Sequence, residues 1–270
     1  MAVQIQYRKD TASNWTSTNP TLLSGEMGYE TDTNRIKVGD GTTAWTSLAY
    51  LAVGGSVGAG FQNMVVQTTG TAASWSLPTV LQSPSAKFKV TIIGGGGQGG
   101  GTPATAGHIG GGGGSGGLVA VYLTFVAGQT TMTYTVGAAG SGAGTNTVGT
   151  AGGSSSIVYN STTYTAGGGG GGGVSGSPAA GTGGTATGGT LNIVGFAGAA
   201  GGVSAATAAK FGNGGSTPLG YGQGGILPNT VTSSSTGTGY GAGGSGAYNG
   251  ATATATAGGA GTAGVVIIEY

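Results

Sequence analysis

The sequence predicts an all-β protein, with a small charged β domain followed by a large glycine-rich β domain. Nine of the 13 Lys, Arg, Asp and Glu side chains (7 basic, 6 acidic) precede Tyr50, whereas Lys210 alone is charged between Val90 and Ile268. That second stretch holds 58 of the 67 glycines. Its apolar segments alternate with a period of two and show no capped helical period, which is typical of strands.

The composition divides the chain into a first domain at 1–51, a Gly/Ser/Ala-rich linker at 52–60 and a second domain at 61–270. In the first domain, two short extended segments flank the turn-forming residues TDTN, which predicts a hairpin over 27–38. Trp45, Leu48 and Tyr50 are candidates for a small core. About fifty residues with so few large apolar groups bury too little surface for independent stability, so we expect oligomerisation.

Several segments of the second domain are strand candidates because β-branched and aromatic residues recur at every second position. In 118–125, Val119, Val121, Leu123 and Phe125 share one face. The other candidates are 88–93, 131–136, 264–270 and the hairpin-like SSIVYNSTTYTA, with Asn160 and Ser161 at its turn.

Unbroken glycine runs, such as 94–97 and 167–173, need a separate explanation. Each ordered glycine costs roughly 0.5–1 kcal/mol relative to alanine, so ordered runs must gain from close backbone approach. Extended left-handed helices with three residues per turn pack side by side only where the facing positions lack a side chain. A collagen triple helix is disfavoured because no long Gly-X-Y frame persists and the chain has only 7 prolines. Packed polyglycine helices or glycine-rich loops remain as alternatives.

Charge and cysteine content exclude several classes of partner. A formal net charge of +1 supplies no electrostatic footprint for nucleic acid, and the absence of cysteine rules out disulfides and thiolate metal sites. No apolar run approaches the roughly 20 residues that span a bilayer. We therefore expect a soluble protein with no cofactor, no metal, no nucleic-acid partner and no membrane insertion.

Catalytic residues are not evident. Glycoside hydrolysis generally requires two carboxyl groups, and Glu269 is the second domain's only Asp or Glu. The acidic residues of the first domain fit turn and hairpin positions, and the single histidine, His108, has no nucleophile or carboxylate nearby in sequence. The match of GYGQGG to a dinucleotide-binding motif lacks the preceding strand and following helix that the motif needs. We expect that the protein is not an enzyme.

Aromatic and amide side chains among glycines predict a binding surface in the segment 212–250. The candidate receptor-binding residues are Tyr221, Tyr240, Tyr248 and Asn249. Tyrosine and asparagine offer rigid contact area and adaptable hydrogen bonds, and we expect Tyr240 and Tyr248 in particular to be exposed. The alternative is that these aromatic rings fill gaps between backbones that have no side chains of their own.

The string GEMGYETDTNRIKVGDGTTAWTSLAY, with the upstream IQYRKDTASNW, resembles the N-terminal domain of phage major tropism determinants, which also opens many phage tail-fibre proteins. The resemblance covers about residues 3–51. It implies a trimeric fibre protein of a phage virion, in which residues 1–51 serve attachment to other virion tail or fibre proteins or the formation of the homotrimer.

The second domain is similar to a glycine-rich domain common in phage tail proteins, through Trp75, Pro78, KFKVTIIGGGG, GGLVAVYLTFVAGQTTMTYTVG and GVVIIEY. In composition, its glycine runs also resemble the tip adhesins of T-even-like phages, where polyglycine helices carry loops that touch the host. These resemblances imply a virion adhesin, made in the host cytoplasm, that binds a host surface glycan or an outer-membrane protein. The alternatives are a structural head or tail decoration fibre without a specific receptor and, more distantly, an ice-binding protein, for which no flat repeat is visible.

Overall fold

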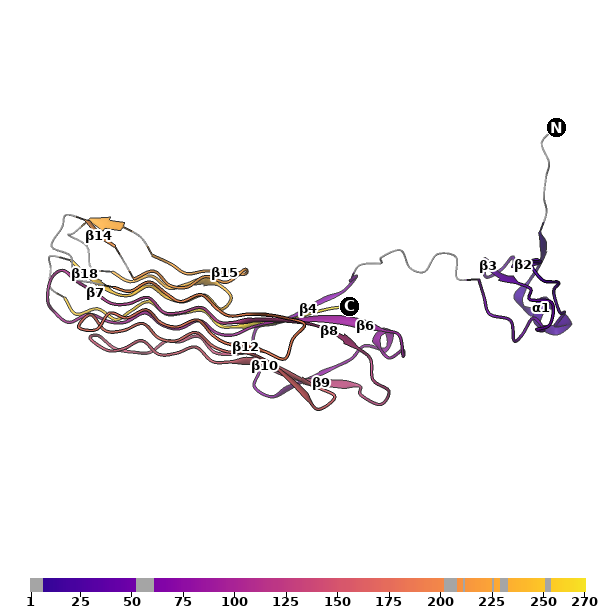
Figure 1. Cartoon of the computed structure of the whole chain (residues 1–270), viewed down its shortest axis with the longest axis horizontal. Coiled ribbons are helices and arrows are strands. Elements are labelled where there is room, and N and C mark those ends of the chain that lie inside the picture. Colours follow the sequence, from indigo (N-terminus) through magenta and orange to yellow (C-terminus); the bar gives the residue numbers. More distant parts are fainter. Residues whose placement is uncertain are drawn as a thin grey trace, which may run out of the picture. The chain divides into compact units, whose positions relative to one another are not determined.

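The computed structural model describes residues 7–51, 61–201, 208–210, 212–224, 226–228, 233–250 and 254–270. The chain forms two compact units, Met1–Ala59 and Gly60–Tyr270 (Figure 1). The predicted linker at 52–60 lies outside the described residues. Strands dominate, and the helical elements of the described residues are one seven-residue α-helix and the short 3-10 turn η1 (Thr79–Leu81). The all-β prediction is therefore confirmed.

The first unit is a three-stranded sheet with one helix. β1 (Arg8–Asp10) runs parallel to β2 (Met27–Glu30), and β2 pairs antiparallel with β3 (Arg35–Val38). The predicted hairpin over 27–38 is confirmed, with the residues TDTN at its turn.

The helix α1 (Ala12–Thr18) follows β1 and is not predicted by the sequence pattern, because seven residues are too few to show a helical period. Its first turn is capped by Thr11, whose Oγ1 accepts a hydrogen bond from Asn14 N at 3.3 Å. The helix ends at Asn19, which has a φ of 43° and donates its N–H to Trp15 O. These caps let a very short helix form beside the sheet.

Two stacked tryptophans form the core of the first unit. The rings of Trp15 and Trp45 lie 4.1 Å apart with an interplanar angle of 14°. Leu22 is buried with them and Leu48 packs against the cluster. The prediction that Trp45 and Leu48 anchor a small core is confirmed.

One part of the second unit is a sandwich of two five-stranded antiparallel sheets. One sheet, with the order β12-β11-β10-β9-β5, consists of β5 (Ala73–Ser76), β9 (Thr131–Thr135), β10 (Ser155–Tyr159), β11 (Thr162–Ala166) and β12 (Ala186–Thr187). The other sheet, with the order β13-β8-β6-β19-β4, consists of β4 (Met64–Gln67), β6 (Lys87–Ile93), β8 (Leu118–Thr124), β13 (Leu191–Ile193) and β19 (Val265–Glu269).

Alternate residues of the two sheets meet in one apolar core. The face predicted for 118–125 is confirmed, since Val119, Val121 and Leu123 are buried and Phe125 packs against them. The predicted hairpin also forms: Asn160 and Ser161 have φ values of 47° and 58°, as a two-residue turn with positive φ at both positions requires. The strand candidates of the sequence thus build the sandwich.

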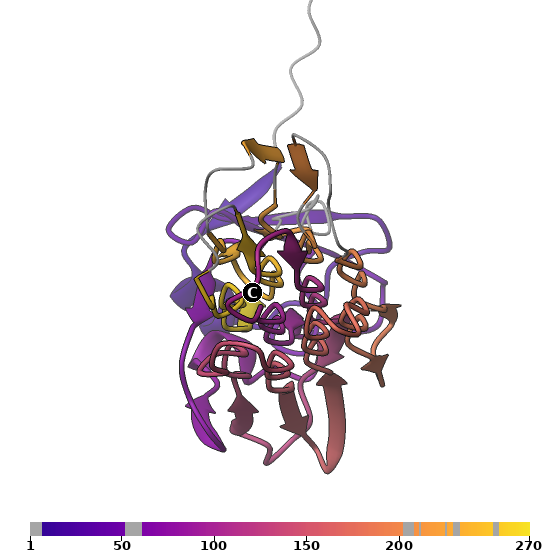
Figure 2. The same cartoon turned by 90° about the vertical axis from the view of Figure 1, so that its left-hand side faces the viewer.

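The strands of the sandwich continue into long extended glycine runs, seen end-on in Figure 2. Neighbouring runs are joined by backbone hydrogen bonds that repeat every three residues. Along the run 94–102 these bonds measure 2.8–3.0 Å: Gly94, Gly97 and Gly100 donate to the run 111–117, Gly95, Gln98 and Gly101 to the run 147–153, and Gly96, Gly99 and Thr102 to the run 256–262. The amides of this run therefore donate to three neighbours in turn, while its carbonyl oxygens accept from further runs, including 169–172 and 244–247. This is the pattern of an extended helix with three residues per turn.

The runs approach so closely that side chains do not fit between them. A Cβ atom added to Gly96 would lie 1.9 Å from Ala242 O, and one added to Gly99 would lie 1.9 Å from Ser245 O. Real Cβ contacts are longer than 3 Å, so glycine is required at such positions. Gly144 differs, because a Cβ atom there would meet nothing within 4 Å.

Short strand pairs lie beyond or beside the runs. The pairs join β7 (His108–Ile109) to β18 (Tyr248–Asn249), β14 (Ala208–Lys210) to β16 (Ile226–Pro228), and β15 (Gly220–Tyr221) to β17 (Thr238–Gly239).

Candidate functional site

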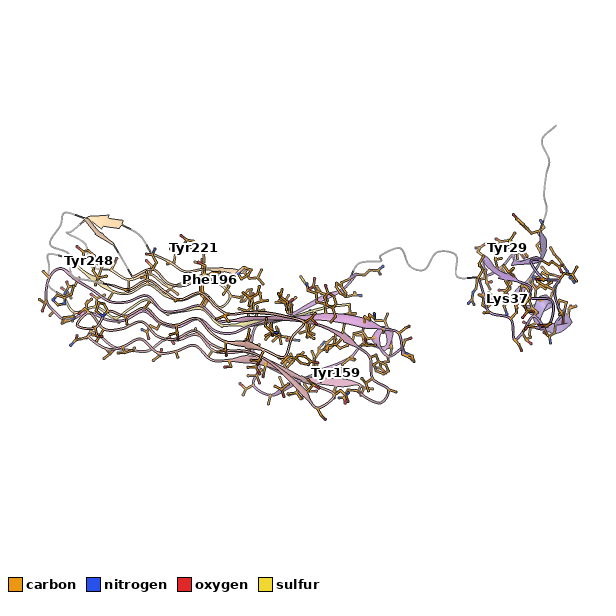
Figure 3. All side chains as sticks on the ribbon, in the orientation of Figure 1. Tyr29, Lys37, Tyr159, Phe196, Tyr221 and Tyr248 are labelled. Carbon is orange, nitrogen blue, oxygen red and sulfur yellow. The ribbon has the colours of Figure 1, made fainter. Side chains whose placement is uncertain are left out.

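Tyr221 is exposed, as a receptor contact requires. It lies in β15, opposite Thr238 of β17, and 63% of its surface is accessible. Phe196 is equally exposed at 63%, and both rings are labelled in Figure 3.

A glycine run separates the backbones of these two residues. An added Cβ at Gly215 would touch Phe196 O, and one at Gly222 would touch Gly214 O. The chain around 214–215 therefore lies between Phe196 and Tyr221. Val194 and Leu219 are also exposed, and we call the exposed side chains of these four residues the aromatic surface.

Tyr240 has a structural position. Its N–H donates to Leu219 O at 3.0 Å, and its own carbonyl oxygen accepts from Thr217 Oγ1 at 2.6 Å. The ring packs over a small cluster on the outer side of the sandwich, formed by Ile93, Leu118 and Val265. Tyr240 is thus half-buried, and its ring covers one end of a sheet.

The expectation that Tyr248 is exposed is wrong, and Asn249 is buried as well. Both have 0% exposure, because β18 pairs with β7 among backbones that leave room for a ring. Asn249 Nδ2 donates to Pro103 O at 2.6 Å, and its Oδ1 accepts from Thr254 N. For Tyr248, the alternative that aromatic rings fill gaps between backbones describes the structure.

Gln98 is a structural residue that sequence reasoning misses. Its side chain is 3% exposed inside the array of runs. The amide makes four hydrogen bonds, two to Ala143 and one each to Thr150 and Gly258. In the sequence, the feature that could have identified Gln98 is that it is a single long polar residue within a glycine run.

His108 has a serine partner that is distant in sequence. Its Nδ1 lies 3.1 Å from Ser175 Oγ. Ser175 is only 4% exposed, so its hydroxyl is not placed to attack a substrate in solution. The contact ties β7 to the end of a glycine run.

The first unit reverses the usual distribution of side chains across its sheet. The buried face carries Glu30 at 1% exposure and Lys37 at 4%. Glu30 accepts hydrogen bonds from the hydroxyls of Tyr50 and Thr33, while Lys37 Nζ donates to Trp45 O at 2.6 Å. Burial lowers the pKa of Lys37, with Glu30 acting in the opposite direction, and the bond to Glu30 raises the pKa of Tyr50.

The opposite face of this sheet is apolar. Tyr29 pairs across strands with Ile36, and Met27 pairs with Val38. Tyr7, Met27, Tyr29 and Ile36 line a hollow of about 250 Å³, which we call the apolar hollow. Apolar groups grouped on an outer face are typical of an interaction site.

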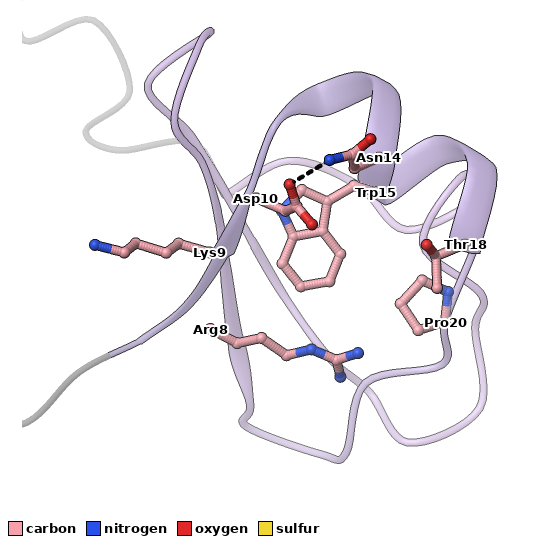
Figure 4. A pocket seen from close by; sticks show the side chains of 7 residues that line it. All are labelled: Arg8, Lys9, Asp10, Asn14, Trp15, Thr18 and Pro20. Atoms are coloured by element: carbon pink, nitrogen blue, oxygen red, sulfur yellow. Dashed lines mark hydrogen bonds between the residues drawn. The ribbon is translucent and has the colours of Figure 1, made fainter.

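A second, smaller pocket lies between β1 and α1 (Figure 4). Its volume is about 90 Å³, which corresponds to about three water molecules. Three of the polar groups at its wall are engaged with one another or with the fold: Arg8 lies over the Trp15 ring and contacts Glu26, and Asp10 accepts from Asn14 at 2.7 Å. This arrangement stabilises the fold and leaves little room for a ligand.

Within the described ranges, no group of three or more His, Asp or Glu residues is placed to hold a metal ion. No helix in the same part of the chain is long and apolar enough to cross a membrane.

Comparison with known proteins identifies relatives for a small part of the chain. Residues 5–43 match the family model described as the major tropism determinant N-terminal domain. A protein named hyaluronoglucosaminidase, from Streptococcus pyogenes phage H4489A, is 39% identical over 49 residues. The matched segment is 18% of this chain and 13% of that protein, so the chain spans only a small part of its relative.

This relative corrects the expectation that the protein is not an enzyme. Its name is that of an enzyme, whereas the expectation rested on the lack of recognisable catalytic residues and motifs within this chain. The family match confirms the resemblance of the N-terminal segment to phage major tropism determinants.

Proposed function

We propose that this chain is a fibre protein of a phage virion that binds the host cell surface through its second unit. The match of residues 5–43 to the major tropism determinant N-terminal domain carries the proposal, because a domain of that description supports a part in phage host selection. In this proposal, residues 1–51 attach the chain to other tail or fibre proteins, and 61–270 reach the host.

The aromatic surface is the proposed contact. Tyr221 and Phe196 present accessible rings, and aromatic rings with few internal degrees of freedom suit recognition surfaces. Apart from Lys210, no residue from 90 to 268 is charged, so binding would rest on stacking, apolar contact and hydrogen bonds. A host glycan or an outer-membrane protein fits this chemistry.

The test is adsorption of virions that carry Tyr221→Ala with Phe196→Ala. We expect a loss of adsorption, whereas Val148→Ala, on another exposed residue at 59%, should adsorb normally. Adsorption should vary little between low and high salt, because Coulomb attraction is not involved. Normal adsorption by the double variant would contradict the site, and a steep salt dependence of the parent would contradict the mechanism.

The first unit is proposed to form a homotrimer through the apolar hollow. Burying Tyr7, Met27, Tyr29 and Ile36 against other copies would supply the apolar burial that so small a unit lacks. Sedimentation should give a trimer for the parent chain and smaller species for Ile36→Lys. A folded monomer of the parent at all concentrations would overturn the trimer.

A decoration fibre without a specific receptor is the structural alternative. Adsorption of virions that assemble with residues 61–270 deleted distinguishes an adhesin from a decoration fibre. Loss of adsorption by such virions would support the adhesin, and unchanged adsorption would support decoration.

The name of the phage relative favours one further candidate, an action on hyaluronan. In the second unit the carboxylate of Glu269 is bound to Lys89 at 2.7 Å, so any paired carboxylates would have to come from elsewhere. Incubation of the purified chain with hyaluronan, followed by measurement of new reducing ends, tests this candidate. Release of reducing ends would support it, and their absence at high protein concentration would count against it.

A further inference from the structure

The outer face of the sheet β13-β8-β6-β19-β4 is largely uncovered. Its inner face belongs to the sandwich core, whereas its outer face presents Met64 at 65% exposure, Tyr122 at 60%, Leu191 at 51% and Val66 at 40%. Phe61, at 42% exposure, stacks on Tyr122 with ring centroids 6.4 Å apart. We call these five side chains the outer apolar face.

These side chains lie on one continuous surface. The register places Leu191, Ala120, Thr91, Ile267 and Val66 across the five strands in one row. The next row joins Tyr122, Lys89, Glu269 and Met64. Tyr240 covers the adjoining cluster of Ile93, Leu118 and Val265, so the chain itself covers this face at one end and leaves the rest open.

We propose that the outer apolar face packs against the same face of the neighbouring copies of this chain, around the threefold axis of the proposed homotrimer. Large exposed apolar patches usually mark interaction sites. In the middle of this one, Lys89 and Glu269 neutralise each other at 2.7 Å, and Lys87 lies at the far end of β6. A surface without net charge at its centre can meet its own copy without repulsion, and it has no charge with which to select an oppositely charged partner.

The short spacer between the two units also favours another copy of this chain as the partner of the outer apolar face. Phe61, the first described residue of the second unit, is itself part of the face. Nine residues, 52–60, join it to the first unit, so even a fully extended spacer spans at most about 32 Å. First units that associate through the apolar hollow therefore hold the outer apolar faces of neighbouring copies close together, at high effective concentration. The inference rests on that proposed association, which supplies the proximity.

Edge strand β4 extends the contact surface. It lies at the margin of the sheet, with Met64 and Val66 pointing outward, and it carries neither charge nor proline. Exposed edge strands of natural proteins usually carry a charged residue or a proline that prevents pairing with another chain. An edge strand without either, beside an apolar face, is typical of a surface that is covered in the assembly.

Absence of cysteine from the chain permits a sharp test. Thr91 and Thr133 are both half-buried threonines on interior strands, but they face outward from opposite sheets of the sandwich. Thr91→Cys therefore reports on the outer apolar face, and Thr133→Cys is its matched control. The measurement is the rate of maleimide labelling of each variant in the full chain, across a range of protein concentrations, alongside sedimentation.

We expect Thr91→Cys to react more slowly than Thr133→Cys in concentrated protein, by about tenfold when about nine-tenths of the faces are occupied, because only the free fraction reacts. Dilution should remove the difference. The double substitution Met64→Glu with Leu191→Glu should also remove the difference in labelling rate. Both positions are largely exposed, so the sandwich should stay folded.

The outcomes separate this inference from the proposed association of the first unit. Equal labelling rates in a chain that sediments as an oligomer would overturn the inference and leave the first-unit contact intact. A monomer with equal rates at every concentration would overturn both. Protection that persists in the double glutamate variant would show that Thr91 is covered by another contact and would also overturn the inference.

Discussion

The first unit and the glycine runs of the second unit build their interiors in opposite ways. The first unit buries side chains, namely a stacked tryptophan pair with Glu30 and Lys37 beside it. The glycine runs of the second unit bury backbone against backbone, and their amides donate hydrogen bonds to neighbouring runs in three directions. One interior is stabilised by what its side chains contact, and the other depends on the absence of side chains. The two should therefore respond to different substitutions.

The largest effect should follow from adding a single methyl group to the glycine array. In Gly99→Ala the new Cβ would lie 1.9 Å from Ser245 O, and bonded runs have little freedom to move apart. We expect destabilisation of at least about 3 kcal/mol, or failure of the second unit to fold. Gly144→Ala is the control, with no atom within 4 Å, and should be neutral or stabilising by about 0.4–1 kcal/mol. Urea denaturation compares the two, and equal midpoints would contradict the packing described here.

Removing the buried amide of Gln98 should have the next largest effect. Gln98→Ala removes four hydrogen bonds, to Ala143, Thr150 and Gly258, and leaves the buried carbonyl of Gly258 without this partner. We expect a loss of about 2–4 kcal/mol in the free energy of unfolding. Gln129→Ala loses one exposed hydrogen bond and should change stability by less than about 0.5 kcal/mol. Similar thermal melts for the two variants would show that Gln98 does not hold the runs together.

In the first unit, Tyr50→Phe should have a moderate effect. It removes the 2.8 Å bond from the Tyr50 hydroxyl to the buried carboxylate of Glu30. A lost hydrogen bond to a charged group costs about 1.5–3 kcal/mol. Unfolding can be followed by the fluorescence of Trp15 and Trp45 in a Trp75→Phe background. Ser17→Ala, which removes one exposed hydrogen bond to Asn14 O outside the core and the apolar hollow, serves as the control. An equal response of the two variants would refute the role of the Glu30 contact.

Acid sensitivity should be the smallest difference between the units. Hydrogen bonds from Thr43 and Thr42 hold the pKa of Asp40 well below its ordinary value of 3.8. The folded state therefore binds fewer protons than the unfolded state, and the stability from Asp40 is present above pH 3.8 and is lost as the pH falls below it. Tryptophan fluorescence should show acid destabilisation of the first unit that is weaker in Asp40→Asn. An unchanged pH profile in that variant would contradict this prediction.

The contrast between the units also explains which parts of the fold the sequence predicts. Alternating side chains predict the sandwich strands, such as β8, because the period of two is a local property. The pairing of the glycine runs is not predictable in this way, because glycines carry no alternation of side chains. The run 94–102 is hydrogen-bonded to nearby runs and also to a run that begins more than a hundred residues away. The helix α1 depends on caps at Thr11 and Asn19 rather than on periodicity.

For the candidate site, the sequence identifies residue types but not their exposure. Tyr221 and Tyr248 have similar glycine-rich surroundings in the sequence, yet one is 63% exposed and the other is buried. The difference arises from the pairing of β18 with β7, a contact across more than a hundred residues. Glycine neighbours indicate flexibility when considered locally, but in the packed array they provide space into which a ring can be buried.

The threefold repeat of hydrogen bonds has a consequence for how the runs can vary. Because every third amide bonds the same neighbour, sliding one glycine run by three residues would restore equivalent bonds, whereas sliding it by one or two would direct each amide to a different neighbour. The frame is fixed where the sequence is not uniform, at the sandwich strands and at Gln98. Insertions in multiples of three could therefore lengthen the array while preserving its lattice.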